Sequence, residues 1–173
     1  MEKRLDIADF TEEVNLIKDE NLRKLTIGML STIPEYFYRI PASSSGKYHP
    51  QYALGEGGLA RHTKAAVKIA ESLLSLEQYK ELPHDKIIMA LILHDTFKQG
   101  ILESGHTVSE HPLLAASFVE HFNDEYHDTL YLVAKLIKSH MGEWYEPKPV
   151  TEAEKFVHLC DYLASRKFLE VIL

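Results

Sequence analysis

Cysteine is almost absent from this chain, since Cys160 is the only one among 173 residues. No internal disulfide can form, and such a sequence fits a reducing compartment. Long apolar runs are absent too. None approaches the roughly 18 residues that a membrane-spanning helix needs, and residues 1–6 lack the apolar core of a signal peptide. We therefore expect a cytoplasmic protein that makes no membrane contact.

Positive charge is also in short supply. The chain has 19 Lys and Arg residues against 26 Asp and Glu residues, which gives a net charge of -7. Such a surface repels polyanions as a whole, so we expect no extended binding of nucleic acid. A small phosphorylated substrate held in a locally positive pocket remains compatible with this balance. The sequence leaves the oligomeric state open.

Signals for β-hairpins are missing as well, because no Asn-Gly or Asp-Gly dipeptide separates alternating apolar runs. Helical periodicity dominates instead. The sequence predicts an all-α fold, a compact single-domain bundle of about six to seven helices over residues 1–173. We expect helices over residues 21–38, with a bend or restart at Pro34, and over residues 59–77, 85–98, 109–122, 130–141 and 152–171.

Several residues mark the ends of these helices. Asp85 and Ser109 are expected N-caps, and Pro112 then falls in a first turn, where proline is tolerated. Thr151 and Glu154 have the spacing of a capping box before the last helix. Residues 41–58 are polar and rich in glycine, and we expect a loop there.

What the chain has in abundance is histidine, with ten residues. The doublet His94-Asp95 closes the apolar run 87–93, where a buried carboxylate is costly unless it is paired or binds a metal. Further potential ligands lie in or at the ends of other expected helices: His62, His111, His140 and Asp161. A single histidine on an apolar helix is more often a core or surface residue than a ligand. The set of six is a stronger signal, because stiff helices can bring it together to hold two divalent cations.

The order of these six residues resembles that of the HD-domain superfamily of metal-dependent phosphohydrolases. The segments that carry the resemblance are residues 58–63, 91–98, 110–112, 139–140 and 161–166, within core motifs at about 41–166. Residues 41–59 are similar to the HD part of a 3′-5′ exoribonuclease group. We expect no room in this chain for that group's OB domain, which binds nucleic acid. The resemblance therefore implies the same fold for this chain but not the same substrate. Phe97 stands where many relatives have glycine, and we expect it to narrow or cover the site beside Lys98.

The resemblance implies a division of the ligands between two cations. His62, His94, Asp95 and Asp161 would hold the first. Asp95, His111 and His140 would hold the second, so that Asp95 bridges both. Mixed histidine and carboxylate donors suit divalent transition metals, namely Fe, Mn, Zn, Co or Ni, better than Ca or Mg. The implied reaction is hydrolysis of a nucleotide or other small phosphate ester, either a monoester or a diester, with Asp95 and Lys98 in the catalytic centre.

Candidate substrate contacts surround this centre. Lys98 lies one helical turn from His94 and could bind a phosphate oxygen, although a solvated lysine favoured by the helix dipole explains it equally well. Arg61 and Lys64 flank His62 and could also meet phosphate, as could His49 in the preceding loop. Surface and loop roles are the simpler explanation for these three.

Three further side chains have open roles. Trp144 could line a pocket for a base, but we expect it to cap the core. His158 could support a ligand from the next layer of side chains. Arg166 could brace a ligand carboxylate or form a surface ion pair.

Two other functions fit the same residues. One is a di-iron oxygenase on the HD scaffold, which would stop working without oxygen. The other is a non-catalytic nucleotide-binding protein, which would bind its ligand tightly and turn nothing over.

Overall fold

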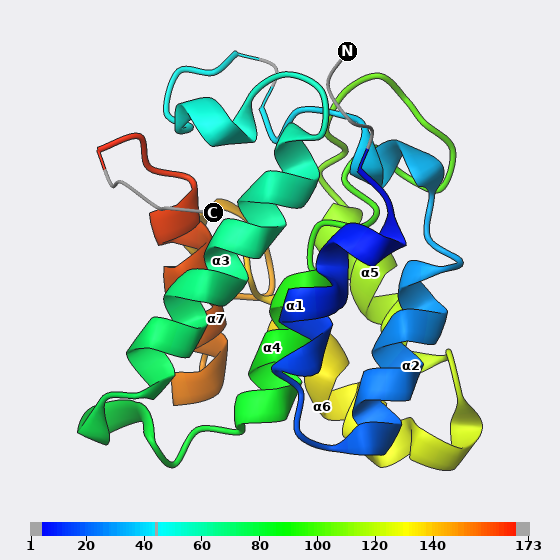
Figure 1. Ribbon diagram of the computed structural model, residues 1–173, viewed down its shortest axis with the longest axis vertical. Helices are drawn as coiled ribbons and strands as arrows, with labels where there is room; N and C mark the ends of the chain where they lie inside the picture. Colours follow the sequence, from blue (N-terminus) through cyan, green and yellow to red (C-terminus); the bar gives the residue numbers. More distant parts are fainter. Residues whose placement is uncertain (1–4, 44, 169–173) are drawn as a thin grey trace.

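The computed structural model describes residues 5–43 and 45–168, and over these residues the chain is helical with no strand (Figure 1). The α-helices are α1 Thr11–Asn15, α2 Glu20–Leu30, α3 Gly58–Leu74, α4 His84–Leu93, α5 His111–Glu120, α6 His127–Lys138 and α7 Glu152–Ala164. Short 3-10 turns lie between them: η1 Ile7–Phe10, η2 Glu35–Tyr38, η3 Gln51–Ala53, η4 Glu77–Tyr79, η5 Asp124–Tyr126 and η6 Gly142–Trp144. The expected all-α class, with six to seven helices, is confirmed.

Helix α4 is the centre of the bundle. Every residue from Ile87 to Leu93 has zero solvent exposure, because the helix is apolar on all sides and must be surrounded. It contacts α1, α2, α3, α6 and α7, and Figure 1 shows it behind α1, with α3 to its left. The residues that follow Leu93 are therefore delivered to the interior of the molecule.

Two expected N-caps are wrong. Helix α4 begins at His84, and the Asp85 carboxylate instead accepts a hydrogen bond from the backbone N–H of Asp19 over 2.7 Å. Helix α5 begins at His111 after Glu110, and the Ser109 hydroxyl donates to the Glu110 side chain. In both places the polar side chain hydrogen-bonds another partner and therefore does not cap the helix.

Other boundaries follow the sequence more closely. Helix α2 stops at Leu30, and the chain restarts after Pro34 as η2. The capping box of α7 is confirmed, since Thr151 accepts from the Glu154 N–H and Glu154 accepts from the Thr151 N–H. Helix α4 ends at Leu93 rather than near residue 98, and α7 ends at Ala164, while residues 169–171 of the expected last helix lie outside the described residues. Helix α1 was not expected, because five residues are too few to show a period.

The loop before α3 crosses the end of the bundle and contacts α7. The Tyr52 hydroxyl donates to the Ala164 carbonyl over 2.9 Å, and the Lys167 N–H donates to the Tyr48 carbonyl over 2.8 Å. Figure 1 shows this loop at the top of the molecule, near the C-terminal end of α7. It is thus held close to two helices that carry candidate ligands.

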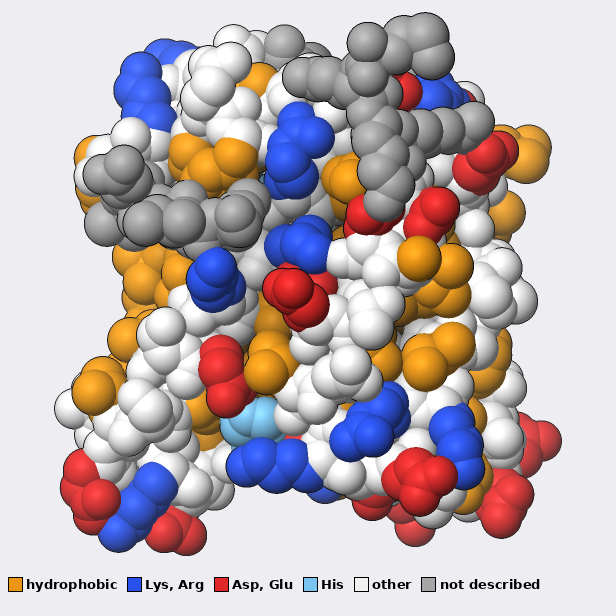
Figure 2. Space-filling model, viewed as in Figure 1, with side chains coloured by type: hydrophobic (Ala, Val, Ile, Leu, Met, Phe, Trp, Pro, Cys, Tyr) orange, Lys and Arg blue, Asp and Glu red, His pale blue; other side chains and the backbone are white. Residues whose placement is uncertain are grey.

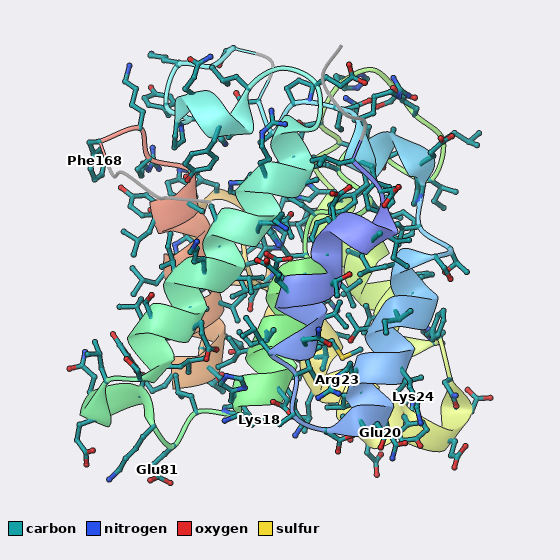
Figure 3. All side chains as sticks on the ribbon, in the orientation of Figure 1. Lys18, Glu20, Arg23, Lys24, Glu81 and Phe168 are labelled. Carbon is teal, nitrogen blue, oxygen red and sulfur yellow. The ribbon has the colours of Figure 1, made fainter. Side chains whose placement is uncertain are left out.

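The surface over α1 and α3 mixes acidic and basic side chains, and little histidine is visible there (Figure 2). A comparable pair lies at the start of α2, where Lys24 Nζ is 2.8 Å from Glu20 Oε1 (Figure 3). Within the described part of the chain, no helix is both long enough and apolar enough to cross a membrane.

Candidate metal centre

The six expected ligands come together from five helices. His62 lies on α3 and Asp161 on α7, His94 and Asp95 follow the last residue of α4, His111 begins α5, and His140 lies two residues beyond α6. All but Asp161 are at most 1% exposed, and the Asp161 side chain is 17% exposed. A buried set of this composition, open to solvent on the Asp161 side, has the form of a site.

Three of the histidines are oriented in the same way. The Nδ1 atoms of His94, His111 and His140 lie 2.7, 2.8 and 2.7 Å from the backbone carbonyl three residues earlier in the chain. A carbonyl oxygen only accepts, so each Nδ1 carries the proton. Each Nε2 therefore presents a lone pair when the ring is neutral, which is the arrangement that a metal ligand needs.

These three Nε2 atoms converge on the Asp95 carboxylate. The Nε2 atoms of His111 and His140 lie 3.1 and 3.7 Å from Asp95 Oδ1, and that of His94 lies 3.6 Å from Oδ2. All three Nε2 atoms and Asp95 Oδ1 are buried without a hydrogen-bond partner. Acceptors that face one another in this way require a cation or a proton between them. The donor set fits a divalent transition metal.

A second group forms around Asp161. Its Oδ1 atom lies 2.9 Å from His62 Nε2 and 3.4 Å from His94 Nε2. Two sets have ligand atoms that all lie within 4.8 Å of one another, His62 with His94 and Asp161, and His94 with Asp95 and His140. His94 belongs to both sets, whereas the resemblance assigned the shared role to Asp95. These His/Asp clusters could hold a metal, and because one imidazole nitrogen binds one cation, His94 can serve only one of the two sets at a time.

The charges of the site favour a cation. Burial by itself would raise the pKa of Asp95, but Lys98 and His94 hold that pKa well below its usual value. The pKa of Asp161 is likewise lowered against its burial, by His62 and His94. Burial would lower the pKa of His94, yet the two carboxylates raise it. Burial lowers the pKa of His140. The carboxylates thus stay ionised and draw positive charge to the cluster.

Two candidate substrate contacts are brought to this cluster. Lys98 Nζ lies 2.5 Å from Asp95 Oδ2. The ring of His49 lies 5.8 Å from that of His62, and its Nδ1 is buried without a hydrogen-bond partner. Burial, with the charges of His62 and Lys98, lowers the pKa of His49 to about 4. His49 is therefore neutral near pH 7.

Two other candidates have different neighbours. The Arg61 guanidinium donates to the carbonyls of Tyr52 and Leu54 over 2.6 and 2.9 Å, so it fixes the loop before α3. Lys64 Nζ lies 3.0 Å from Glu13 Oε2 on α1. The structure does not bring these two cations to the metal ligands.

Phe97 lies in the core, and Trp144 differs from the expectation. Phe97 is 7% exposed and packs against Phe118 of α5, with ring centroids 5.2 Å apart, and its role in narrowing the site beside Lys98 stays a prediction. Trp144 does not cap the core, because it is 53% exposed. Its ring is nearly parallel to that of Tyr162, at an angle of 3°. In the sequence, the one sign of this pair is that Tyr162 directly follows Asp161, an expected ligand.

His158 has the supporting position that the sequence suggested. Its Nδ1 lies 2.7 Å from the backbone carbonyl of His140. Arg166 forms no ion pair with Asp161 or another carboxylate among the described residues, so it does not brace a ligand carboxylate there, and its role in a surface ion pair stays a prediction. Its guanidinium lies over the Tyr162 ring instead, 4.0 Å from the centroid.

Comparison with known proteins supports the resemblance to the HD-domain superfamily. The model of a family described as "HD domain" matches residues 59–166. The chain is 27% identical to a 3′-5′ exoribonuclease YhaM of Listeria monocytogenes serotype 4b, over 97% of this chain and 56% of the relative. It is 27% identical to the YhaM of Geobacillus sp. strain WCH70, over 95% of this chain and 53% of the relative. No solved structure matches.

The chain spans about half the length of these curated relatives. The match nevertheless covers most of this chain, and it includes every one of the six clustered residues. The resemblance in the ordered histidine and aspartate motifs is thereby confirmed, and the chain belongs to the HD-domain family.

Proposed function

We propose that this protein is a metal-dependent phosphohydrolase that uses a dinuclear centre to cleave a phosphate ester of a nucleotide or another small molecule. One observation carries the proposal, namely the convergence of three unpartnered imidazole Nε2 atoms on the buried carboxylate of Asp95. The relatives are named 3′-5′ exoribonucleases, which favours a phosphodiester next to a nucleoside as the bond that is cleaved.

The proposed ligands divide into two groups that share Asp95. The first cation would be held by His62, His94, Asp95 and Asp161. The second would be held by Asp95, His111 and His140. Histidine and carboxylate donors favour Fe, Mn, Zn, Co or Ni. When bound, such cations would polarise a phosphoryl oxygen and lower the pKa of a coordinated water.

Lys98 and His49 are the proposed substrate contacts. The Lys98 side chain is 14% exposed, so its ammonium group can reach a phosphate oxygen while it stays beside Asp95. The His49 ring lies beside that of His62, its Nδ1 has no partner of its own, and we propose that it hydrogen-bonds a substrate oxygen. We leave Arg61 and Lys64 out of the proposed site, because the Tyr52 and Leu54 carbonyls and Glu13 already engage them.

A small substrate or a short single-stranded end fits this chain better than a long nucleic acid. The net charge of -7 opposes broad contact with a phosphate backbone. The proposed setting is a cytoplasmic one and the proposed unit a single domain over residues 1–173. The single cysteine supports the first point, and the continuous hydrophobic core of the described residues supports the second.

The test is a hydrolysis screen of metals against substrates. Protein treated with a chelator is reloaded with Mn, Co, Ni, Fe or Zn and given nucleoside monophosphates, triphosphates, cyclic nucleotides and short oligonucleotides. We expect metal-dependent turnover of at least one class. Asp95→Asn should lose both metal content and turnover, while Asp128→Asn, an exposed control on α6, should keep both. An Asp95→Asn protein that retains both would refute the bridging role.

The same donor set could also hold two redox-active irons, so the assay is repeated without oxygen. Hydrolysis that persists without oxygen supports the phosphohydrolase, whereas activity that requires oxygen supports a di-iron oxygenase. Tight nucleotide binding without turnover under any metal would identify a non-catalytic nucleotide-binding protein.

A further inference from the structure

Three aromatic rings surround one arginine beside the metal centre. The guanidinium carbon of Arg166 lies 4.0 Å from the ring centroid of Tyr162 and 5.7 Å from those of Trp144 and Tyr48. The rings of Trp144 and Tyr162 are nearly parallel, with centroids 5.8 Å apart. These four residues are called the aromatic cluster below.

Two of the rings are open to solvent. Trp144 and Tyr48 are each 53% exposed, although both are large aromatic side chains. Neither ring contributes its whole area to the core, so the cluster offers flat apolar surface at the protein boundary. Large exposed aromatic surface of this kind is a common feature of binding sites.

Among the described residues, Arg166 has no carboxylate partner of the kind a guanidinium normally has. It forms no ion pair with any carboxylate within residues 5–43 and 45–168, and its Nε is buried without a hydrogen-bond partner. A buried N–H donor with no acceptor is costly. The terminal guanidinium nitrogens are not among the buried unpartnered atoms, and they can donate to an acceptor from outside the protein, such as a phosphate oxygen or a base carbonyl.

The aromatic cluster is joined to the metal ligands at three points. Tyr162 directly follows Asp161, and Tyr48 directly precedes His49, whose ring lies 5.8 Å from that of His62. The Trp144 ring lies 5.7 Å from that of His158, which donates to the His140 carbonyl. The aromatic cluster is therefore built on the same segments as His49, His140 and Asp161.

The local charge suits the same ligand. Lys47 Nζ lies 5.0 Å from the Tyr48 ring centroid, and Lys167 follows Arg166 and is exposed. Two cations, Arg166 and Lys47, thus lie against these aromatic rings, in a chain that carries a charge of -7 as a whole. Flat rings with interspersed cations are the arrangement by which proteins bind single-stranded nucleotides, through stacking on the bases and contacts to phosphate.

We propose that the aromatic cluster binds the nucleobase of the nucleotide whose phosphate reaches the metal centre, with Arg166 donating to an acceptor on that nucleotide. This inference rests on the proposed phosphohydrolase function and assigns its substrate to nucleotides or the single-stranded ends of oligonucleotides. Stacking on an aromatic ring tolerates any base, so the aromatic cluster gives preference for a nucleotide without strong choice among the four bases.

Trp144 makes the inference directly measurable, because it is the only tryptophan in the chain. Its fluorescence is followed in a chelator while the full chain is titrated with AMP, CMP, a dinucleotide or ribose 5-phosphate. We expect saturable quenching by the three base-containing ligands at concentrations at least tenfold below any effect of ribose 5-phosphate. Equal responses to AMP and ribose 5-phosphate would overturn the inference.

Variants locate the binding. Arg166→Gln and Tyr162→Leu keep Trp144 as the reporter, and each should weaken AMP binding by about tenfold. Tyr131→Leu removes another half-exposed tyrosine, on α6, and should leave AMP binding unchanged. Trp144→Leu, measured by equilibrium dialysis, should remove the preference for AMP over ribose 5-phosphate. Circular dichroism shows which variants are folded, and normal AMP binding by folded Arg166→Gln and Trp144→Leu would overturn the assignment.

The two proposals can fail separately. Base-dependent quenching without hydrolysis under any metal refutes the phosphohydrolase and keeps the nucleobase site. Hydrolysis with no base dependence refutes the nucleobase site and keeps the phosphohydrolase.

Discussion

The Nδ1 of His158 donates a hydrogen bond to the backbone carbonyl oxygen of His140 over 2.7 Å, and so connects α7 to the turn that follows α6. The same turn packs closely against this ring, because a Cβ placed on Gly142 would lie 2.2 Å from a His158 ring atom. His158 therefore sets the position of His140, which is one expected metal ligand. His158 itself lies one helical turn before Asp161, another expected ligand.

Replacement of His158 by leucine should weaken metal binding. The variant leaves the His140 carbonyl without its donor, which should lower the free energy of unfolding by about 1–3 kcal/mol. Loss of a residue that orients a ligand should lower metal affinity by roughly 10- to 100-fold. His158→Gln, which keeps an N–H donor, should recover part of the affinity. Metal titration by calorimetry and urea unfolding measure the two effects, and unchanged affinity in His158→Leu would refute the positioning role.

The ligand set could be predicted because its residues depend on local sequence. The apolar run 87–93 predicts a buried helix, and a doublet such as His94-Asp95 at its end must then be paired or bound. The sequence could not show that α4 stops at Leu93. The turns that carry His94 and His140 begin only where α4 and α6 end, so the helical pattern of the sequence before them is not interrupted.

Long-range partners account for most of the errors. Asp85 looks like an N-cap, but the Asp19 N–H, which is remote in sequence, takes its carboxylate. Trp144 looks like a core residue, and only the fold shows that it lies beside Tyr162 and Arg166 at the surface. Such contacts depend on how the helices are placed relative to one another, and a single sequence does not contain that information.

Addition of a divalent transition metal should stabilise the fold. A ligand present at 100 times its dissociation constant adds about 2.7 kcal/mol, which corresponds to a rise in melting temperature of roughly 5–10 °C for a chain of this size. Differential scanning fluorimetry with Mn, Co, Ni or Zn, with and without a chelator, measures this shift. Asp95→Asn should abolish most of it, whereas an equal shift in both proteins would place the metal elsewhere.

Glu154 should make stability depend on pH in the acid range. Although burial alone would raise it, hydrogen bonds from the Thr151 and Val150 N–H groups lower the pKa of Glu154 below its ordinary value of 4.5. A carboxyl whose folded-state pKa is lowered contributes stability that is present above about pH 4.5 and is lost as the pH falls through the folded-state value. Glu154→Gln should therefore be about 0.5–1 kcal/mol less stable than the natural chain at pH 7.

The difference between these two proteins should shrink as the pH falls below 4.5. Urea unfolding at a series of pH values from 3 to 7 tests this, with Glu152→Gln on the exposed side of the same first turn as the matched control. A Glu154→Gln deficit that stays constant over the whole range would mean that the charge of Glu154 does not contribute.

Two helical glycines should respond to alanine with opposite signs. A Cβ on Gly58, the first residue of α3, would lie 2.4 Å from the Ala53 carbonyl oxygen, so Gly58→Ala forces the backbone of the preceding loop to move. We expect a loss of about 1–3 kcal/mol. In α2, a Cβ on Gly28 meets only Phe122 at 3.4 Å, and Gly28→Ala should add roughly 0.5–1 kcal/mol. Equal effects on the unfolding free energy would contradict the close approach at Gly58.

Cys160 should be inert in the folded protein and should report on the opening of α7. Its side chain has zero exposure, and burial raises the pKa of its thiol, so almost no reactive thiolate exists near pH 8. We expect a disulfide reagent such as DTNB to label less than about a tenth of the native protein in an hour, and one equivalent at once in guanidinium chloride. Because Asp161 is the next residue, a bound metal should oppose opening of α7 and slow the residual labelling further. Rapid labelling of the native protein, unchanged by metal, would show that α7 opens independently of the metal centre.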